Sequence, residues 1–90
     1  MITEYIQTQP RDFIDITRGI KRIEIRRNDK DFQVGDCLYF REFEDEKSMG
    51  NFATTKVTYI IRHEDFPEAL KPGYCAMGFS LVTFGCEVRE

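Results

Sequence analysis

Apolar side chains recur at helical spacing near the start of the chain. Gly19 follows this stripe and suits the left-handed conformation that commonly ends a helix. Thr8 precedes it and is a suitable N-cap residue. The pattern therefore predicts an N-terminal helix ending near residue 19, whose buried face carries Phe13, Ile16 and Ile20.

Four later segments alternate apolar and polar residues with the two-residue period of a strand. They begin near Arg22, Val34, Thr54 and Tyr74. In each segment we expect the apolar face to be buried and the charged face to be exposed. The predicted core is therefore Ile23, Ile25, Leu38, Phe40, Val57, Tyr59, Met77 and Phe79.

The intervening segments have the composition of turns. Residues 28–31 and 71–73 are expected to be turns, with Phe32 packing back onto the core, and residues 48–51 a hairpin-like loop. Residues 63–70 are expected to be short helical or irregular. Together these elements predict an α+β fold: a small β-barrel of about five to six mostly antiparallel strands, with an N-terminal helix and a short second helix.

Length and composition restrict the protein to a simple organisation. Ninety residues form a single domain, 1–90, with one modest core. The N-terminus lacks a secretory signal pattern, and no stretch approaches the roughly 20 apolar residues of a membrane span, so we expect a cytoplasmic protein without membrane contact. Three cysteines without CxxC spacing predict reduced, structural thiols.

Charge is segregated along the chain. Residues 18–30 contain six cationic and two acidic side chains, a local charge of +4, so the rest of the protein carries −7 within a total of −3. Much of the negative charge falls in residues 42–46. Such segregation would orient a polyanion toward one face of the molecule.

The segments Gly19 to Arg26 and Val34-Gly35-Asp36 resemble the ASCH group of the PUA-like superfamily. Within that group, the run from Glu24 to Glu42 is similar to a family of short phage and bacterial proteins of unassigned function. The resemblance continues through residues 57–61 and 71–74 and covers about residues 10–81. It implies a PUA-like barrel and leaves residues 82–90 as a tail or an added strand.

The resemblance also implies a ligand-binding cleft between the first helix and the barrel, lined by Lys21, Glu24 and Arg26, and RNA or a nucleotide-like ligand as its occupant. An arginine offers a planar fork to phosphate and a lysine a point charge, whereas Glu24 can orient the cations or accept from a base amino group. Arg27 would add a phosphate contact. Tyr39 and Tyr74 are the preferred stacking residues, with Tyr59 and Phe43 as further candidates.

Three other interpretations use the same residues. Glu24 and Arg26 could form an ion-pair network that only joins helix and barrel. Some small relatives of the fold look like amidohydrolases of N-acylated pyrimidine nucleosides, in which Lys21 and Glu24 would be catalytic; however, Glu24 stands where those enzymes have a threonine. The third interpretation is a phage protein-interaction module.

His63 lacks suitably spaced partners, so we expect no metal site, and no motif indicates a cofactor.

Overall fold

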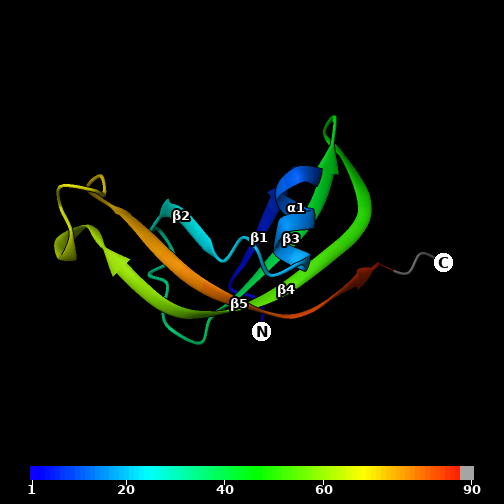
Figure 1. The fold of residues 1–90 in the computed structure, drawn as a ribbon. Coiled ribbons are helices and arrows are strands. Elements are labelled where there is room, and N and C mark those ends of the chain that lie inside the picture. Colours follow the sequence, from blue (N-terminus) through cyan, green and yellow to red (C-terminus); the bar gives the residue numbers. More distant parts are fainter. Residues whose placement is uncertain (88–90) are drawn as a thin grey trace.

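The computed structural model describes residues 1–87 and is an α+β domain, a five-stranded sheet curled around one short helix (Figure 1). The elements in chain order are β1 (Glu4–Thr8), α1 (Pro10–Thr17), β2 (Ile23–Arg27), β3 (Cys37–Glu44), β4 (Lys47–Arg62), the 3-10 turn η1 (His63–Asp65) and β5 (Tyr74–Cys86). The strand order is β1-β3-β4-β5-β2, and only the β1–β3 pair is parallel. The predicted barrel-like α+β class is confirmed, although the expected second helix is only the turn η1.

Strand β1 is absent from the sequence prediction. It precedes the helix and pairs with β3, so that Tyr5 lies opposite Tyr39. Thr8, expected as the helix N-cap, is a buried residue of β1 instead, and Gln9 takes the N-cap position without a capping side-chain hydrogen bond. The strand was missed because it is short and buries only one large apolar side chain, Ile6.

The end of α1 and the turn between β3 and β4 also differ from the prediction. Gly19 adopts a φ of 72°, as expected after a helix, but Ile20 is exposed rather than part of the buried stripe. The β3–β4 turn falls at Asp45-Glu46, where both residues have positive φ, a hairpin geometry that matches the twist of the strands. The loop expected at 48–51 is therefore part of β4.

Strand β5 continues beyond the expected end, to Cys86. Residues 83–86 pair with β4 and so extend an existing strand. Residues 88–90 of the expected tail lie outside the described residues.

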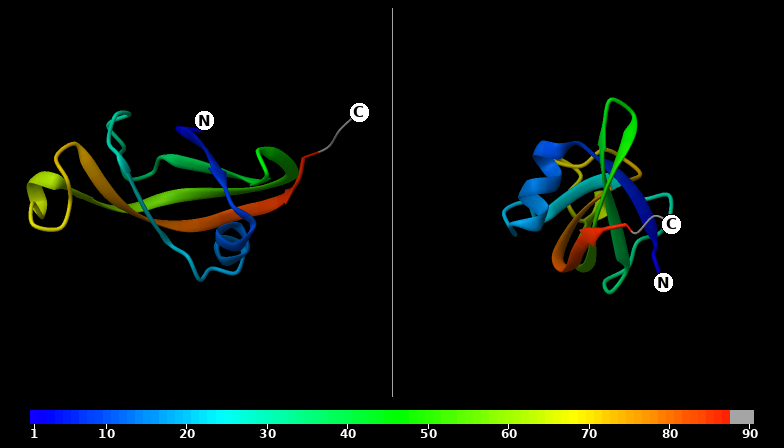
Figure 2. Two further views of the ribbon diagram at one scale, coloured as in Figure 1. Left: turned by 90° about the horizontal axis from the view of Figure 1, so that it is seen from above. Right: turned by 90° about the vertical axis from the view of Figure 1, so that its right-hand side faces the viewer.

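The core fills the concave side of the curled sheet, and α1 packs there near one end of the molecule (Figure 2). β3 and β5 bury the faces that the sequence predicts, and Phe32 is completely buried, with its N–H donating to Asn28 Oδ1 at 2.9 Å. The buried apolar cluster comprises Ile6, Phe13, Ile16, Phe32, Leu38, Phe40, Ala53, Val57, Cys75, Met77 and Phe79.

Strand β2 has the opposite orientation to the one predicted. Ile23 and Ile25 are each 60% exposed, whereas Glu24 and Arg26 face inward. The cause is register: Glu24 lies opposite Met77 and Arg26 opposite Cys75, and directly opposed residues share a face of the sheet.

Tyr59 was also wrongly assigned to the core. A register shift between Val57 and Tyr59 interrupts the alternation of β4, so Val57 stays buried and Tyr59 is 66% exposed. Ile60, expected on the opposite face, packs against the core instead.

The cysteines occupy three different environments. Cys75 is buried, Cys37 is half-buried and Cys86 is exposed, and all three are free thiols. Burial raises the pKa of the Cys75 thiol, which keeps it protonated and unreactive. Within residues 1–87, none of the helices has the length and apolar character needed to cross a membrane.

Candidate functional site

The two edge strands of the sheet, β1 and β2, approach each other across the open side of the curled sheet. They stand at opposite ends of the strand order. Side chains bridge the seam between them: Glu4 of β1 lies 3.6 Å from Arg26 Nη2 and 3.6 Å from Lys30 Nζ. Ion pairs therefore span the side on which a closed barrel would have backbone hydrogen bonds.

A cleft of about 360 Å³ lies at this seam, among β1, the beginning of α1 and β2. Its volume is at the low end of the range for small-molecule sites, roughly 300–1,000 Å³. It lies between the first helix and the curled sheet, where the resemblance to ASCH-type domains implies a cleft. Its lining is mostly polar and comprises Ile6, Gln7, Thr8, Gln9, Asp12, Lys21, Glu24, Arg26 and Phe40.

Charges of alternating sign cross the cleft. Lys21 Nζ lies 3.9 Å from Asp12 Oδ2 and 3.5 Å from Glu24 Oε1. Arg26 donates to Glu24 Oε2 at 3.3 Å and continues the series to Glu4. Glu24 is the centre of this series, and its side chain is 13% exposed, against 30% for Lys21 and 32% for Arg26.

This series makes the cleft electrically balanced. With Lys30 included, three carboxylates face three cations, and Asp12 of α1 and Glu4 of β1 offset two of the four net positive charges of residues 18–30. The ion pairs that a purely structural interpretation expects are therefore present. The same arrangement offers a ligand fixed donors and acceptors side by side.

Arg27 and Tyr74 do not join the cleft. They are opposite each other on β2 and β5, on the outer face of the sheet, and the Arg27 guanidinium carbon lies 5.5 Å from the centroid of the Tyr74 ring. Tyr59 is on the outer face as well, near Gly78 of β5. The predicted group of phosphate-binding and stacking residues is thus divided between two faces.

Tyr39 lies on the outer face of β3, stacked against Phe52 at 5.3 Å between ring centroids. Its hydroxyl donates to Glu87 Oε2 at 3.0 Å. The pKa of Tyr39 is raised above its usual 10.0, mainly by partial burial and secondly by the Glu87 carboxylate.

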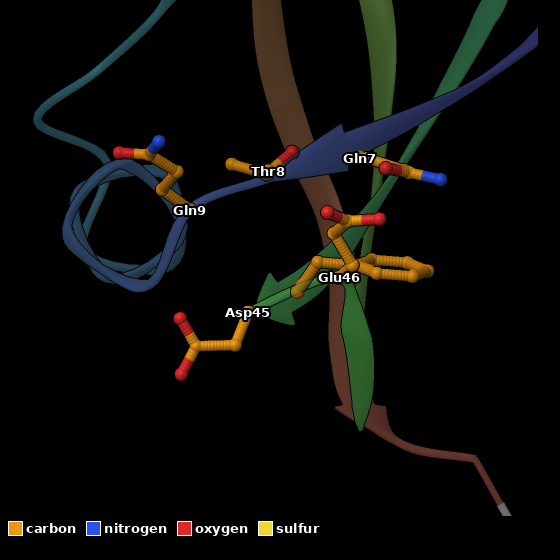
Figure 3. Close-up of a pocket in the computed structure, with 6 residues that line it drawn as sticks. Gln7, Thr8, Gln9, Asp45 and Glu46 are labelled. Atoms are coloured by element: carbon orange, nitrogen blue, oxygen red, sulfur yellow. The ribbon is translucent and has the colours of Figure 1, made fainter.

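Phe43 lines an adjoining pocket of about 280 Å³ beside the β3–β4 turn, which shares Gln7, Thr8 and Gln9 with the cleft. Figure 3 shows Gln7, Thr8 and Gln9 together with the acidic side chains Asp45 and Glu46 around it. The acidic lining makes this pocket unsuitable for phosphate.

Sequence reasoning missed the contribution of β1 to the site. None of Glu4, Gln7, Gln9 and Asp12 was proposed as a site residue. A weak signal was available, because Glu4 to Thr8 contains three residues that favour strands, Tyr5, Ile6 and Thr8. Parallel pairing with β3, far along the chain, is not encoded in any local pattern.

The remaining candidate for ligand chemistry, His63, braces the turn after β4. Its Nδ1 atom lies 2.6 Å from the carbonyl oxygen of Leu70. Within residues 1–87 no three His, Cys, Asp or Glu side chains are grouped in a way that could hold a metal ion.

A family model described as a domain of unknown function, DUF3850, matches residues 3–79. No curated protein gives a significant match. Among solved structures, the crystal structure of hypothetical protein PH0355 is similar, with 18% sequence identity and a TM-score of 0.56 over 88% of this chain and 98% of that chain. At this identity the likeness supports the fold alone.

Proposed function

The chain belongs to the DUF3850 family, a family of unknown function, and we propose that this member binds RNA or a nucleotide-like ligand, with one nucleotide unit held in the cleft among α1, β1 and β2. The similarity of its motifs to ASCH-type, PUA-like domains is the reason for considering nucleic acid. The chemistry of the cleft is the reason for placing the ligand there.

The observation that carries the proposal is the setting of Glu24. Its carboxylate is 13% exposed, faces the cleft and is fixed from both sides by Lys21 and Arg26. A fixed carboxylate is a good acceptor for base amino groups, and the Gln7 and Gln9 amides nearby can both donate and accept. A cleft without net charge suits a nucleoside, which presents donors and acceptors but no charge of its own.

Phosphate contacts come from cations outside the cleft. Arg22 and Arg27 are exposed on the segment that carries the local +4 charge, Arg27 on the outer face of β2. Because the protein as a whole is acidic, affinity for RNA depends on this segment and is strongly salt-dependent. With about three or four phosphate contacts to a single strand, log affinity falls with log salt at a slope of roughly −2 to −3.

The proposal is tested by fluorescence anisotropy with a short single-stranded RNA over a range of salt concentrations. We expect Glu24→Gln, which keeps the shape of the side chain, to weaken binding at least about tenfold through the lost charge-assisted hydrogen bonds. Glu64→Gln is the matched control, because Glu64 is an exposed carboxylate in η1, outside the cleft. Thermal melting of each variant separates loss of binding from loss of folding.

Absence of binding by the unaltered protein at low salt would overturn the proposal. So would equal affinities for Glu24→Gln and Glu64→Gln. A third contrary result is a loss of binding by Glu24→Gln that disappears when binding is measured well below the melting temperature of this variant, because the loss would then be one of folding.

One observation favours a second candidate, the amidohydrolase: Lys21 and Glu24 meet in the cleft, 3.5 Å apart. Against it, Lys21 also contacts Asp12 at 3.9 Å, so both charged neighbours of its amino group are carboxylates, whereas a catalytic lysine is usually activated by an apolar pocket or a neighbouring cation. An active enzyme would hydrolyse an N-acylated cytidine and lose all turnover in both Lys21→Ala and Lys21→Arg. Chromatography of a reaction at high protein concentration decides the matter, and no turnover would remove this candidate for that substrate class.

A further inference from the structure

Three aromatic rings form a row on the outer face of β1, β3 and β4, away from the cleft. Tyr39 is at the centre, with Tyr5 at 5.2 Å and Phe52 at 5.3 Å between ring centroids. The Arg41 guanidinium carbon lies 5.7 Å from the centre of the Tyr5 ring and 5.8 Å from that of Tyr39. Tyr5, on the edge strand, is 58% exposed, so the row ends in an accessible ring.

An anion already occupies the polar side of this row. Oε2 of Glu87, just beyond the end of β5, accepts hydrogen bonds from Arg41 Nε at 3.1 Å, Arg41 Nη2 at 2.7 Å and the Tyr39 hydroxyl at 3.0 Å. Three donors thus converge on one carboxylate oxygen. A phosphate oxygen makes the same kind of contact with a guanidinium and a phenol. The Arg41 side chain is 40% exposed, so an external anion can reach it.

We propose that this aromatic row is a second contact surface for single-stranded RNA, on which one base stacks on Tyr5 and a phosphate replaces the Glu87 carboxylate on Arg41. Aromatic side chains beside a cation, on the open face of a sheet, are the usual means of holding single-stranded nucleic acid. The choice of RNA as occupant rests on the proposed function of the cleft. Glu87 then competes with the RNA phosphate for Arg41.

The topology connects this surface to the cleft through one strand. β1 is an edge strand, and successive residues of a strand point to opposite faces of the sheet. Glu4 belongs to the ion pairs at the seam, and Tyr5, the next residue, belongs to the aromatic row. A single strand of RNA that passes over this edge therefore contacts both faces with neighbouring nucleotides, whereas a single nucleotide contacts only one.

The test compares a single ribonucleotide with a hexanucleotide RNA as ligands of the full chain. Tyr5→Ala should weaken hexanucleotide binding about five- to thirtyfold, the loss of one stacked base, and leave binding of the single ribonucleotide unchanged. Phe66→Ala is the matched control, since Phe66 is a similarly exposed aromatic residue, at 51%, in the turn that follows η1.

Glu87→Gln should strengthen hexanucleotide binding, by up to about fivefold, since a partly exposed ion pair is the competing interaction. It should also steepen the salt slope by somewhat under one unit as Arg41 becomes available to phosphate. Glu64→Gln removes one negative charge in the same way, so it measures how much the change in net charge alone affects RNA binding.

Each outcome identifies which proposal fails. If Tyr5→Ala and Glu87→Gln behave like their controls while Glu24→Gln loses binding, the aromatic row is a structural or protein-binding feature and the cleft proposal stands. If the single ribonucleotide does not bind but Tyr5→Ala weakens the hexanucleotide, the cleft proposal fails and the aromatic row stands. If the hexanucleotide does not bind at low salt, both proposals are overturned.

Discussion

Strands β2 and β3 alternate apolar and polar residues in the same way, yet they face the core with opposite sides. In β3, Leu38 and Phe40 are completely buried. In β2, Ile23 and Ile25 are each 60% exposed, and the charged residues Glu24 and Arg26 point inward. β3 has neighbours on both sides, β1 and β4, whereas β2 is an edge strand beside the open seam.

The difference shows what a period of two does and does not specify. Alternation determines which residues share a face, but pairing register determines which face is inward, and a one-residue shift exchanges the two faces. Beside the seam an inward charge is tolerable, because Lys21 and Arg26 remain about one-third exposed and every charge in the series has a partner. The inward polar face of β2 is the feature from which we infer a binding site.

The largest expected effect contrasts the two strands directly. Phe40→Ala should lower the free energy of unfolding by about 3–5 kcal/mol, since it empties a fully buried site. Ile25→Ala should cost under about 1 kcal/mol, as for an exposed side chain. Chemical denaturation measures both, and similar costs for the two variants would mean that β2 faces the core with its isoleucines.

The next effect concerns the charges that β2 turns inward. Glu24→Ala should lower the free energy of unfolding by about 1–3 kcal/mol, because Lys21 and Arg26 each lose a charged partner in a half-buried setting. Glu64→Ala, on an exposed turn, should change it by no more than about 0.5 kcal/mol. A Glu24→Ala variant as stable as Glu64→Ala would show that the inward charges contribute nothing to folding.

Arg27 distinguishes the outer face of β2 from its inner face. Arg27→Ala should leave the melting temperature nearly unchanged, because within residues 1–87 its exposed side chain contacts only the Tyr74 ring, on the outer face. It should make the salt dependence of RNA binding shallower by somewhat under one unit. Anisotropy and thermal melting record the two quantities, and a destabilised variant with an unaltered slope would assign Arg27 a structural role.

The smallest expected effect is a pH dependence on the outer face of β3. Because the folded pKa of Tyr39 is raised above 10.0, the contribution of its protonated form to stability is complete below pH 10 and is lost as the pH rises through the folded pKa. Tyr39→Phe removes this titration. The difference in unfolding free energy between the two proteins should therefore shrink above pH 10, and a constant difference would exclude the effect.

The sequence predicted the fold class, the glycine after the helix, the buried faces of β3 and β5 and the packing of Phe32. These features depend on local periodicity and turn chemistry. That Lys21, Glu24 and Arg26 line one cleft was implied by the resemblance to ASCH-type domains and not by local pattern. Sequence reasoning failed to predict the buried face of β2, the exposure of Tyr59 after a register shift, and the existence of β1. Each of these depends on which strands pair and in what register. The aromatic candidates were separated from the cleft for the same reason.

The central claim is that the inward polar face of β2 binds a ligand, and an NMR titration of the ¹⁵N-labelled protein with short single-stranded RNA tests it most directly. We predict that the amide shifts change most from Lys21 to Arg26 and from Gln7 to Asp12, the segments that line the cleft, and that they saturate with added RNA. Changes confined to the exposed isoleucine face of β2 or to the acidic turn at Asp45-Glu46, or no changes at low salt, would contradict the account.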